Sequence, residues 1–176
     1  MTPETDSISI QNGGNRIMKQ KELSRWLRAI VIVCWVLCAV MGAVFMPFAF
    51  RILAAEHPEA AWLTWPRLII FWIALIPVIL ALWQGWQIFG EIGRDNSFCL
   101  ENARRLKIIS YLAAGDTLLV VVYAILLAAA QSLFLSVILL HLMVIFVGIA
   151  VAVATAALGH LTHKAAVLQD ENELTI

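Results

Sequence analysis

The chain has 176 residues, of which 62% are hydrophobic and only 14% are charged. Soluble domains carry about 25% charged residues, so this composition excludes an ordinary soluble globular protein. The 12 basic and 12 acidic residues cancel to a formal net charge of 0, which removes the electrostatic argument for direct binding of nucleic acid.

The N-terminal segment is polar. Residues 1–24 include Gly13 and Gly14 and lack a helical spacing of apolar side chains, which predicts a disordered segment. A secretory signal would place basic, apolar and small residues in that order at the start, and this order is absent. The first apolar run is also too long for a cleavable signal. We therefore expect the membrane-embedded part of the chain to begin after these residues.

Four apolar segments have the length that a transmembrane helix requires. A helix rises about 1.5 Å per residue, so roughly 20 apolar residues cross the ~30 Å hydrocarbon core of a bilayer. Lipid offers no hydrogen-bond partners, which favours helices in such segments. The predicted fold is an all-α membrane protein, a four-transmembrane-helix antiparallel bundle within residues 25–164, followed by a tail at 165–176. The expected spans are 29–50, 68–89, 108–130 and 133–159, and Gln131 and Ser132 form a tight turn between the last two.

Basic residues are distributed unevenly around these spans. Ten of them lie on the side that holds both termini and the 90–107 connector, whereas only Arg51 and Arg67 lie on the other side. Because lysine and arginine accumulate on the cytoplasmic side of a membrane, we expect a multi-pass protein with both termini in the cytoplasm. The ten residues are Arg16, Lys19, Lys21, Arg25, Arg28, Arg94, Arg104, Arg105, Lys107 and Lys164.

Proline and small residues mark particular points in the spans. Pro77 removes one backbone hydrogen bond near the middle of the second span, which predicts a kink. Small residues recur at the three- to four-residue spacing that lets helices approach closely. They are Ala39 and Gly42 in the first span and Gly148, Ala152 and Ala156 in the fourth. We interpret them as packing positions within the bundle, and a homodimer contact is the alternative.

The 90–107 connector predicts a helix that starts outside the membrane. Asp95, Asn96 and Ser97 are typical N-cap residues, so a helix is expected to begin near Ser97 and run unbroken into the third span. Glu101 precedes Arg105 by four residues, which is the spacing of a helical ion pair. This basic helix is either an anchor at the lipid phosphates or a docking surface for a partner.

Two stretches of the chain resemble a known family. Phe98-Cys-Leu-Glu-Asn-Ala-Arg-Arg-Leu-Lys-Ile-Ile109 follows the second span, and Leu168-Gln-Asp-Glu-Asn-Glu-Leu-Thr-Ile176 follows the fourth. With the four-span layout, they are similar to the bacterial membrane family called domain of unknown function 2975, over about residues 25–176. The resemblance implies a bacterial inner (plasma) membrane protein with no established enzymatic activity. It also implies association with a small helix-turn-helix regulator of the Cro type, because members are often encoded beside one.

The acidic C-terminal tail suggests how such a partner would be bound. The last helix is expected to extend to about Leu168, after which acidic residues lead to an apolar chain end. That end would add to a soluble partner as a short strand or fill a groove on it. The alternatives are a tail folded back on the connector and a frayed tail. The predicted docking residues are Phe98, Glu101, Asn102, Arg104, Arg105, Lys107, Glu171, Asn172, Leu174, Thr175 and Ile176.

Three polar side chains inside the spans are candidate functional residues. Asp116 is the only acidic residue within a span, and a carboxylate at the centre of a membrane helix costs about 2.5–3.5 kcal/mol on insertion. We interpret it as a buried, hydrogen-bonded carboxyl, and an ion or proton site is the alternative. Gln84 should lie at a similar depth. His141 should lie about 9 Å further from the cytoplasmic side, too far for a direct pair with Asp116.

The sequence shows no pattern typical of catalysis or of cofactor and metal binding. Cys34, Cys38 and Cys99 form no disulfide framework, because two lie in an apolar span and the third lies in the basic connector. No serine, cysteine or histidine constellation suggests a nucleophile, and no two spans each supply a histidine for haem. We therefore expect a protein that is not an enzyme and holds no cofactor or metal.

The sequence thus favours a non-enzymatic membrane module that docks or regulates a small cytoplasmic helix-turn-helix regulator and does not itself bind nucleic acid. A small transporter or ion-coupled carrier that uses Asp116 is the first alternative. The second alternative is a receptor for a peptide or lipid through the outer loop, which contains Glu56, His57 and Glu59.

Overall fold

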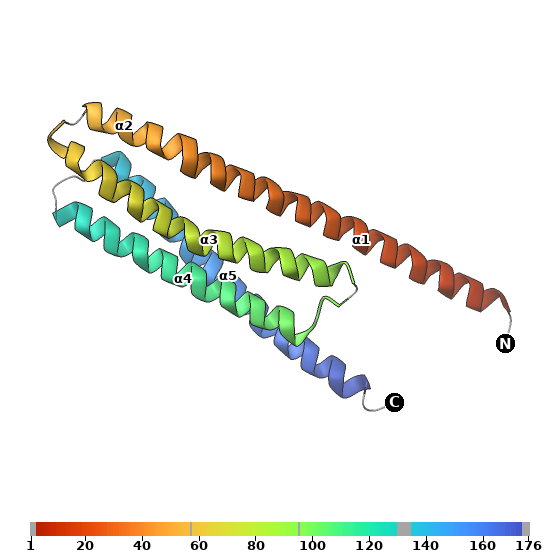
Figure 1. The fold of residues 1–176 in the computed structure, drawn as a ribbon. Helices are drawn as coiled ribbons and strands as arrows, with labels where there is room; N and C mark the ends of the chain where they lie inside the picture. Colours follow the sequence, from red (N-terminus) through yellow and green to blue (C-terminus); the bar gives the residue numbers. More distant parts are fainter. Residues whose placement is uncertain (1–2, 57, 95, 130–134, 174–176) are drawn as a thin grey trace.

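The first span is part of one long helical rod. The computed structural model describes residues 3–56, 58–94, 96–129 and 135–173 (Figure 1). Helix α1 (Pro3–Val40) continues through a π-helical segment, η1 (Met41–Phe45), into α2 (Met46–Glu56). The backbone is therefore helical from Pro3, in contrast to the disorder expected for residues 1–24. Helix propagation explains this difference, since each residue added to an existing helix gains a hydrogen bond without a new nucleation cost.

The π-helical segment lies directly before a proline. Pro47 has no N–H, and its ring would clash with the carbonyl four residues earlier, so a regular α-helix is disfavoured there. The wider turn relieves this conflict, and the Met46 N–H bonds to the Met41 carbonyl. Gly42 in this segment is buried, and a Cβ added to it would lie 3.2 Å from Leu75. Gly42 is therefore a packing position, as predicted.

The second span is a single helix. Helix α3 (Thr64–Ile92) follows a short 3₁₀ helix, η2 (Pro58–Leu63), and contains the whole predicted span. Pro77 lies inside α3, which continues as α-helix on both sides of it. Within the outer loop, His57 lies outside the described residues.

Helix α4 (Leu100–Ala129) begins at Leu100 rather than near Ser97, because a different residue caps it. The Sγ atom of Cys99 accepts a hydrogen bond from the Asn102 N–H at 3.4 Å. The Asn102 side-chain amide donates to the carbonyls of Ser97 at 3.1 Å and Asn96 at 3.4 Å. Asn102 thus holds the connector against the start of the helix.

Two further predictions for this region are confirmed. One helix runs from the connector through the third span, and Arg105 Nε lies 3.4 Å from Glu101 Oε1. Asp95 lies outside the described residues.

Helix α5 (Leu135–Glu173) is longer than predicted. It continues past the expected end near Leu168, because residues 160–173 contain neither glycine nor proline and nothing in them interrupts the helix. The predicted turn at Gln131 and Ser132 and the chain end at Leu174–Ile176 lie outside the described residues.

Small residues of α5 pack against α4. A Cβ on Gly148 would overlap Thr117, and the Ala152 carbonyl accepts a hydrogen bond from Ser110 Oγ at 2.8 Å. A Cβ on Gly159 would lie 3.3 Å from the carbonyl oxygen of Ala103. Gly148 and Ala152 are thus confirmed as packing positions, whereas Ala156 is exposed. The seam follows a repeat of alternating four and three residues, which reaches position 159 and bypasses 156.

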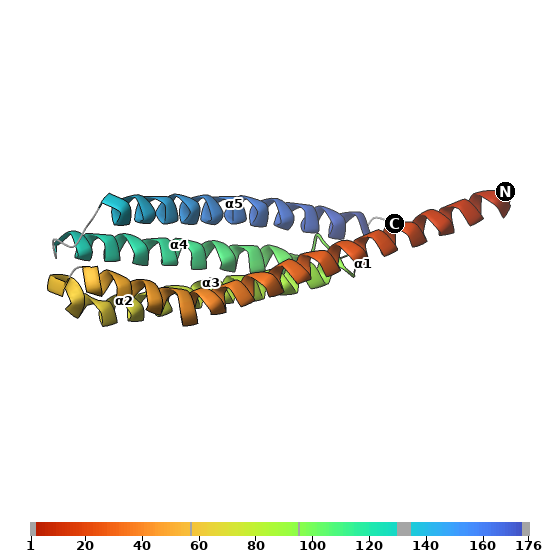
Figure 2. The same cartoon turned by 90° about the horizontal axis from the view of Figure 1, so that it is seen from above.

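The four rods form an open antiparallel arc and not a closed bundle. In sequence order, α3 packs against α1 and α2, α4 packs against α3, and α5 packs against α4 (Figure 2). Within the described residues, neither α1 nor α2 contacts α5. The predicted all-α, four-span layout is correct, but the expected bundle is not closed, because the described residues of the first and last rods do not contact each other.

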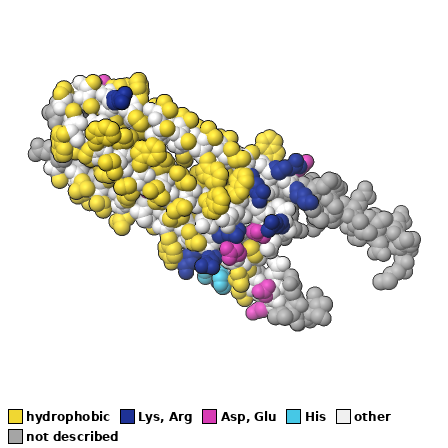
Figure 3. All heavy atoms as spheres, in the orientation of Figure 1, with side chains coloured by type: hydrophobic (Ala, Val, Ile, Leu, Met, Phe, Trp, Pro, Cys, Tyr) yellow, Lys and Arg dark blue, Asp and Glu magenta, His cyan; other side chains and the backbone are white. Residues whose placement is uncertain are grey.

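Apolar side chains cover the outside of the molecule (Figure 3). Phe146 is 73% exposed and Trp65 is 72% exposed, and no span has more than 17% of its most apolar window buried. Lys and Arg gather instead at one end (Figure 3). We call this the basic end, where α3 and α5 end and α4 starts; it carries Arg25, Arg28, Arg94, Arg104 and Arg105. Four helices that are long and apolar enough to span a bilayer identify a multi-pass membrane protein.

Candidate functional site

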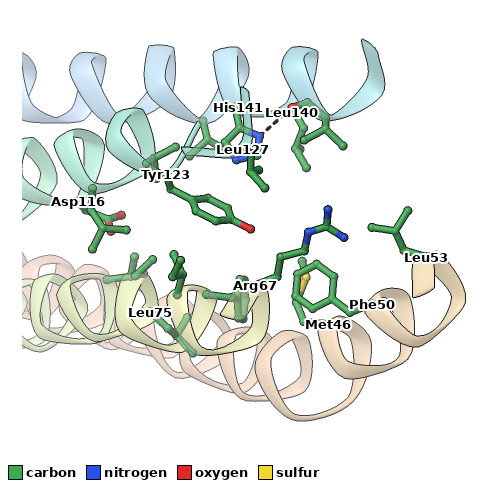
Figure 4. Close-up of a pocket in the computed structure, with 18 residues that line it drawn as sticks. Met46, Phe50, Leu53, Arg67, Leu75, Asp116, Tyr123, Leu127, Leu140 and His141 are labelled. Carbon is green, nitrogen blue, oxygen red and sulfur yellow. Dashed lines mark hydrogen bonds between the residues drawn. The ribbon is translucent and has the colours of Figure 1, made fainter. Parts of the chain in front are cut away.

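A cavity of about 380 Å³ lies between α2, α3, α4 and α5. Its volume lies within the range of small-molecule sites. The walls are apolar except for four side chains, which come from three different helices (Figure 4). These are Arg67 from α3, Asp116 and Tyr123 from α4, and His141 from α5.

Arg67 is the most unusual of these side chains because it is a buried cation. It lies in the first turn of α3, and only 7% of its surface is exposed. Within the described part of the chain, no carboxylate lies within ion-pair distance of it. Its guanidinium points into the cavity, on the side toward which the Tyr123 hydroxyl is directed (Figure 4). A buried charge is costly unless it is paired, so this cation favours an anion beside it.

Tyr123 and His141 form the polar part of the wall opposite Arg67. Their ring centroids are 5.7 Å apart with a tilt of 42°. His141 Nδ1 lies 2.8 Å from the Val137 carbonyl oxygen of its own helix. Since a carbonyl only accepts, Nδ1 donates this hydrogen bond.

Asp116 lies at the other end of the cavity, with its carboxylate directed inward (Figure 4). Its Oδ1 atom is buried and has no hydrogen-bond partner among the described residues. This differs from the predicted hydrogen-bonded carboxyl: Asp116 faces an apolar cavity and not a polar neighbour. No described hydrogen bond joins Asp116 to His141, although both residues line the same cavity. Gln84 is half-buried on α3 and does not line it.

Sequence analysis missed Arg67 and Tyr123 as site residues. Arg67 was counted as a charge flanking the second span, because an arginine beside an apolar run normally reaches the water. The distance of each residue from the end of its span would have indicated that Arg67 and Tyr123 lie at a similar depth. Arg67 follows the start of α3, and Tyr123 precedes the end of α4 at the same end of the molecule. The burial itself depends on α2 and α5, which no local pattern specifies.

The cavity is open on one side. Helices α2 and α5 both line it, yet they make no contact with each other. These helices carry exposed apolar side chains, so in a bilayer the open side would face lipid.

The predicted docking residues lie at the basic end but do not all face outward. Phe98 is 58% exposed, and Arg104 and Lys107 are exposed. Asn102 is only 1% exposed, so it is unavailable to a partner, because its amide is used within the connector. The Arg105 side chain is 14% exposed.

The tail residues of the predicted docking surface belong to a helix. Glu171 and Asn172 are exposed in the last turn of α5, which extends beyond the start of α4 (Figure 1). Leu174, Thr175 and Ile176 lie outside the described residues.

The described part of the chain contains no disulfide. No group of three or more metal-binding side chains occurs there. Cys34, Cys38 and Cys99 are free thiols.

The fold and the cavity define a class of protein: a multi-pass helical membrane protein with an intramembrane cavity that contains a buried cation. A family match defines the protein more narrowly than this class does. A family model described as "Protein of unknown function (DUF2975)" matches residues 48–176, so the chain belongs to this family. The match starts within α2, later than residue 25, and covers every cavity residue except Met46. No curated protein and no solved structure matches the chain.

Proposed function

We propose that this protein is a non-enzymatic membrane receptor that binds an anionic amphiphile in its cavity. The observation that carries the proposal is Arg67, a buried cation without a carboxylate partner among the described residues. An acidic headgroup beside Arg67 would supply the missing charge and accept strong hydrogen bonds from the guanidinium. The apolar walls would hold an alkyl chain, and the open side lets the ligand enter from the bilayer.

The polar groups favour a carboxylate or phosphate over a neutral headgroup. Tyr123 adds a hydroxyl donor near the guanidinium, so one anionic headgroup would contact both side chains (Figure 4). Asp116 lies at the far end of the cavity and would repel a second negative charge. The expected ligand therefore has one anionic end and an apolar chain, as in a fatty acid.

The test uses a dansyl-labelled undecanoic acid and the purified full-length chain in zwitterionic nanodiscs. We expect saturable binding to the parent chain, and Arg67→Gln should weaken it at least tenfold, since hydrogen bonds to a charged group contribute about 1.5–3 kcal/mol. The methyl ester of the same probe should bind weakly and equally to both. Arg51→Gln is the matched control, because Arg51 is an exposed cation on α2.

A second variant protects the test against misfolding of Arg67→Gln. Tyr123→Phe keeps the ring and removes only the hydroxyl, so it should weaken acid binding a few-fold and leave ester binding unchanged. Equal acid binding by the parent, Arg67→Gln and Tyr123→Phe chains would refute the proposal.

A second candidate function is the docking of a small helix-turn-helix regulator at the basic end, which we propose to be cytoplasmic. Exposed Phe98, Arg104 and Lys107 support it, because an exposed aromatic ring beside cations is typical of interfaces. Co-purification of the candidate regulator with the parent chain should be lost with Arg104→Glu and kept with Arg51→Glu. Loss with both variants, or with neither, would contradict docking at this end.

The carrier alternative depends on Asp116, whose unpartnered Oδ1 supports it. A receptor should produce no flux in liposomes loaded with a pH dye, whereas a proton-coupled carrier should show flux that Asp116→Asn abolishes. Such flux would refute the receptor proposal and support the carrier.

A further inference from the structure

A second hollow of about 400 Å³ lies at the basic end, between α1 and the end of α3. It contains four cations, Lys21, Arg25, Arg28 and Arg94, and among the residues that the structure describes no carboxylate lines it. It shares no lining residue with the intramembrane cavity. The proposed receptor function therefore does not involve it.

Glycine residues create this hollow. A Cβ on Gly90 would overlap the Arg28 guanidinium, and a Cβ on Gly93 would lie 2.7 Å from Ser24 Oγ. Ser24 is buried and donates a hydrogen bond to the Phe89 carbonyl at 2.6 Å, which joins α1 to the last turns of α3. The hollow thus has a fixed backbone floor and is more than a set of surface cations.

The guanidinium of Arg28 is fixed by an aromatic ring on one of its faces. Its guanidinium carbon lies 5.1 Å from the centroid of the Trp86 ring, which favours a cation at this position. Trp86 stacks on Trp35, with ring centroids 5.9 Å apart. The Arg28 Nε atom is nevertheless buried without a hydrogen-bond partner among the described residues. A rigid arginine with an unused donor is a typical arrangement for binding an anion.

The other cations are also available. Arg94 Nη1 lies 3.3 Å from Glu91, but the Arg94 side chain is 77% exposed, so this pair is weak. Among the side chains described from Lys21 onward, no carboxylate pairs with Lys21, Arg25 or Arg28. The described cations that line the hollow therefore exceed the carboxylates beside it, which are Glu22 and Glu91.

We propose that this hollow binds the phosphate of an anionic phospholipid headgroup. Its position favours a lipid over a free ion: the exposed apolar residues Ile32 and Val36 follow Arg25 and Arg28 at helical spacing on the same side of α1, so a bound headgroup would have its acyl chains against the helix. Basic pockets between membrane helices bind acidic headgroups in this way, and each nearby Lys or Arg contributes about fivefold in affinity.

Native mass spectrometry of the full-length chain in detergent tests the proposal. Titration with phosphatidylglycerol should give one tightly retained lipid, and phosphatidylcholine should be retained at least tenfold less. Lys21→Gln and Arg94→Gln should each weaken retention about fivefold. Both side chains are exposed, so neither substitution threatens the fold. Arg104→Gln is the matched control, because Arg104 is an exposed cation at the same end outside the hollow.

Two outcomes would overturn the proposal. An equal loss with Arg104→Gln would show that the lipid responds to the general positive potential of this end and not to the hollow. Displacement of the lipid by millimolar inorganic phosphate would show that the occupant is free phosphate. Resistance to phosphate together with losses confined to Lys21→Gln and Arg94→Gln would establish the headgroup site.

Discussion

Replacing Gly148 with alanine tests how α4 and α5 are held together. The added Cβ would overlap Thr117 Oγ1 and lie 3.3 Å from Thr117 Cβ. The Thr117 hydroxyl cannot rotate away without cost, because it donates a hydrogen bond to the Ala113 carbonyl at 2.7 Å. Either the helices separate slightly or this hydrogen bond is lost.

The expected destabilisation follows from these two routes. Overpacking a tight contact typically costs about 1–3 kcal/mol, and the loss of one hydrogen bond costs about 1 kcal/mol. Thr117→Ala removes the overlapping oxygen, so Gly148→Ala should cost much less in that background. The double-mutant cycle should give a coupling energy of about 1–2 kcal/mol.

The assay is equilibrium unfolding by SDS in mixed micelles, followed by far-UV circular dichroism. Gly115→Ala is the matched control, because it lies on α4 with nothing within 4 Å of the added Cβ. Alanine there should be neutral or stabilise by up to about 1 kcal/mol, as glycine disfavours helix. If Gly148→Ala unfolds like Gly115→Ala, or if Thr117→Ala fails to rescue it, the close α4–α5 contact is wrong.

Three further substitutions separate structural from surface roles. Asn102→Ala should cost about 1–3 kcal/mol and speed proteolysis of the connector, because the amide is buried and its bonds to two carbonyls disappear. Glu101→Gln, one residue away, should change stability by no more than about 1 kcal/mol in the same SDS titration, since the Glu101 side chain is 56% exposed. Trp35→Ala should cost about 3 kcal/mol and change the fluorescence of Trp83 and Trp86, which stack on it at 6.1 and 5.9 Å.

The spans were predictable because a bilayer imposes a strong, local requirement. Each span needs roughly 20 apolar residues in one helix, and each of the four apolar segments of the sequence has this length. The Glu101–Arg105 pair was predictable for the same reason, since four residues fix both side chains on one helix face. The cap of α4 was not, because Cys99 is a weaker acceptor than the neighbouring Asn96 and Ser97.

The cavity could be predicted only in part. Asp116 and His141 stood out as polar residues in apolar runs, and both line it. Arg67 did not stand out, because the first turn of a membrane helix is an ordinary place for arginine. Its burial occurs in a cavity that residues of α2, α3, α4 and α5 line together. This is a property of packing, which a local pattern does not contain.

The open side between α2 and α5 also bears on the choice between a ligand and a second copy of the chain. A second copy would fill the gap with apolar side chains, because the spans at 29–50, 68–89 and 133–159 contain no carboxylate. The only acidic residue in the spans is Asp116, which already faces the cavity of its own chain. A dimer closed across this gap through its spans alone would therefore cover Arg67 without supplying an anion, and it would make the burial of that cation more costly. An amphiphile with an acidic headgroup fills the same space and neutralises the charge, so ligand binding should oppose such a dimer and not promote it.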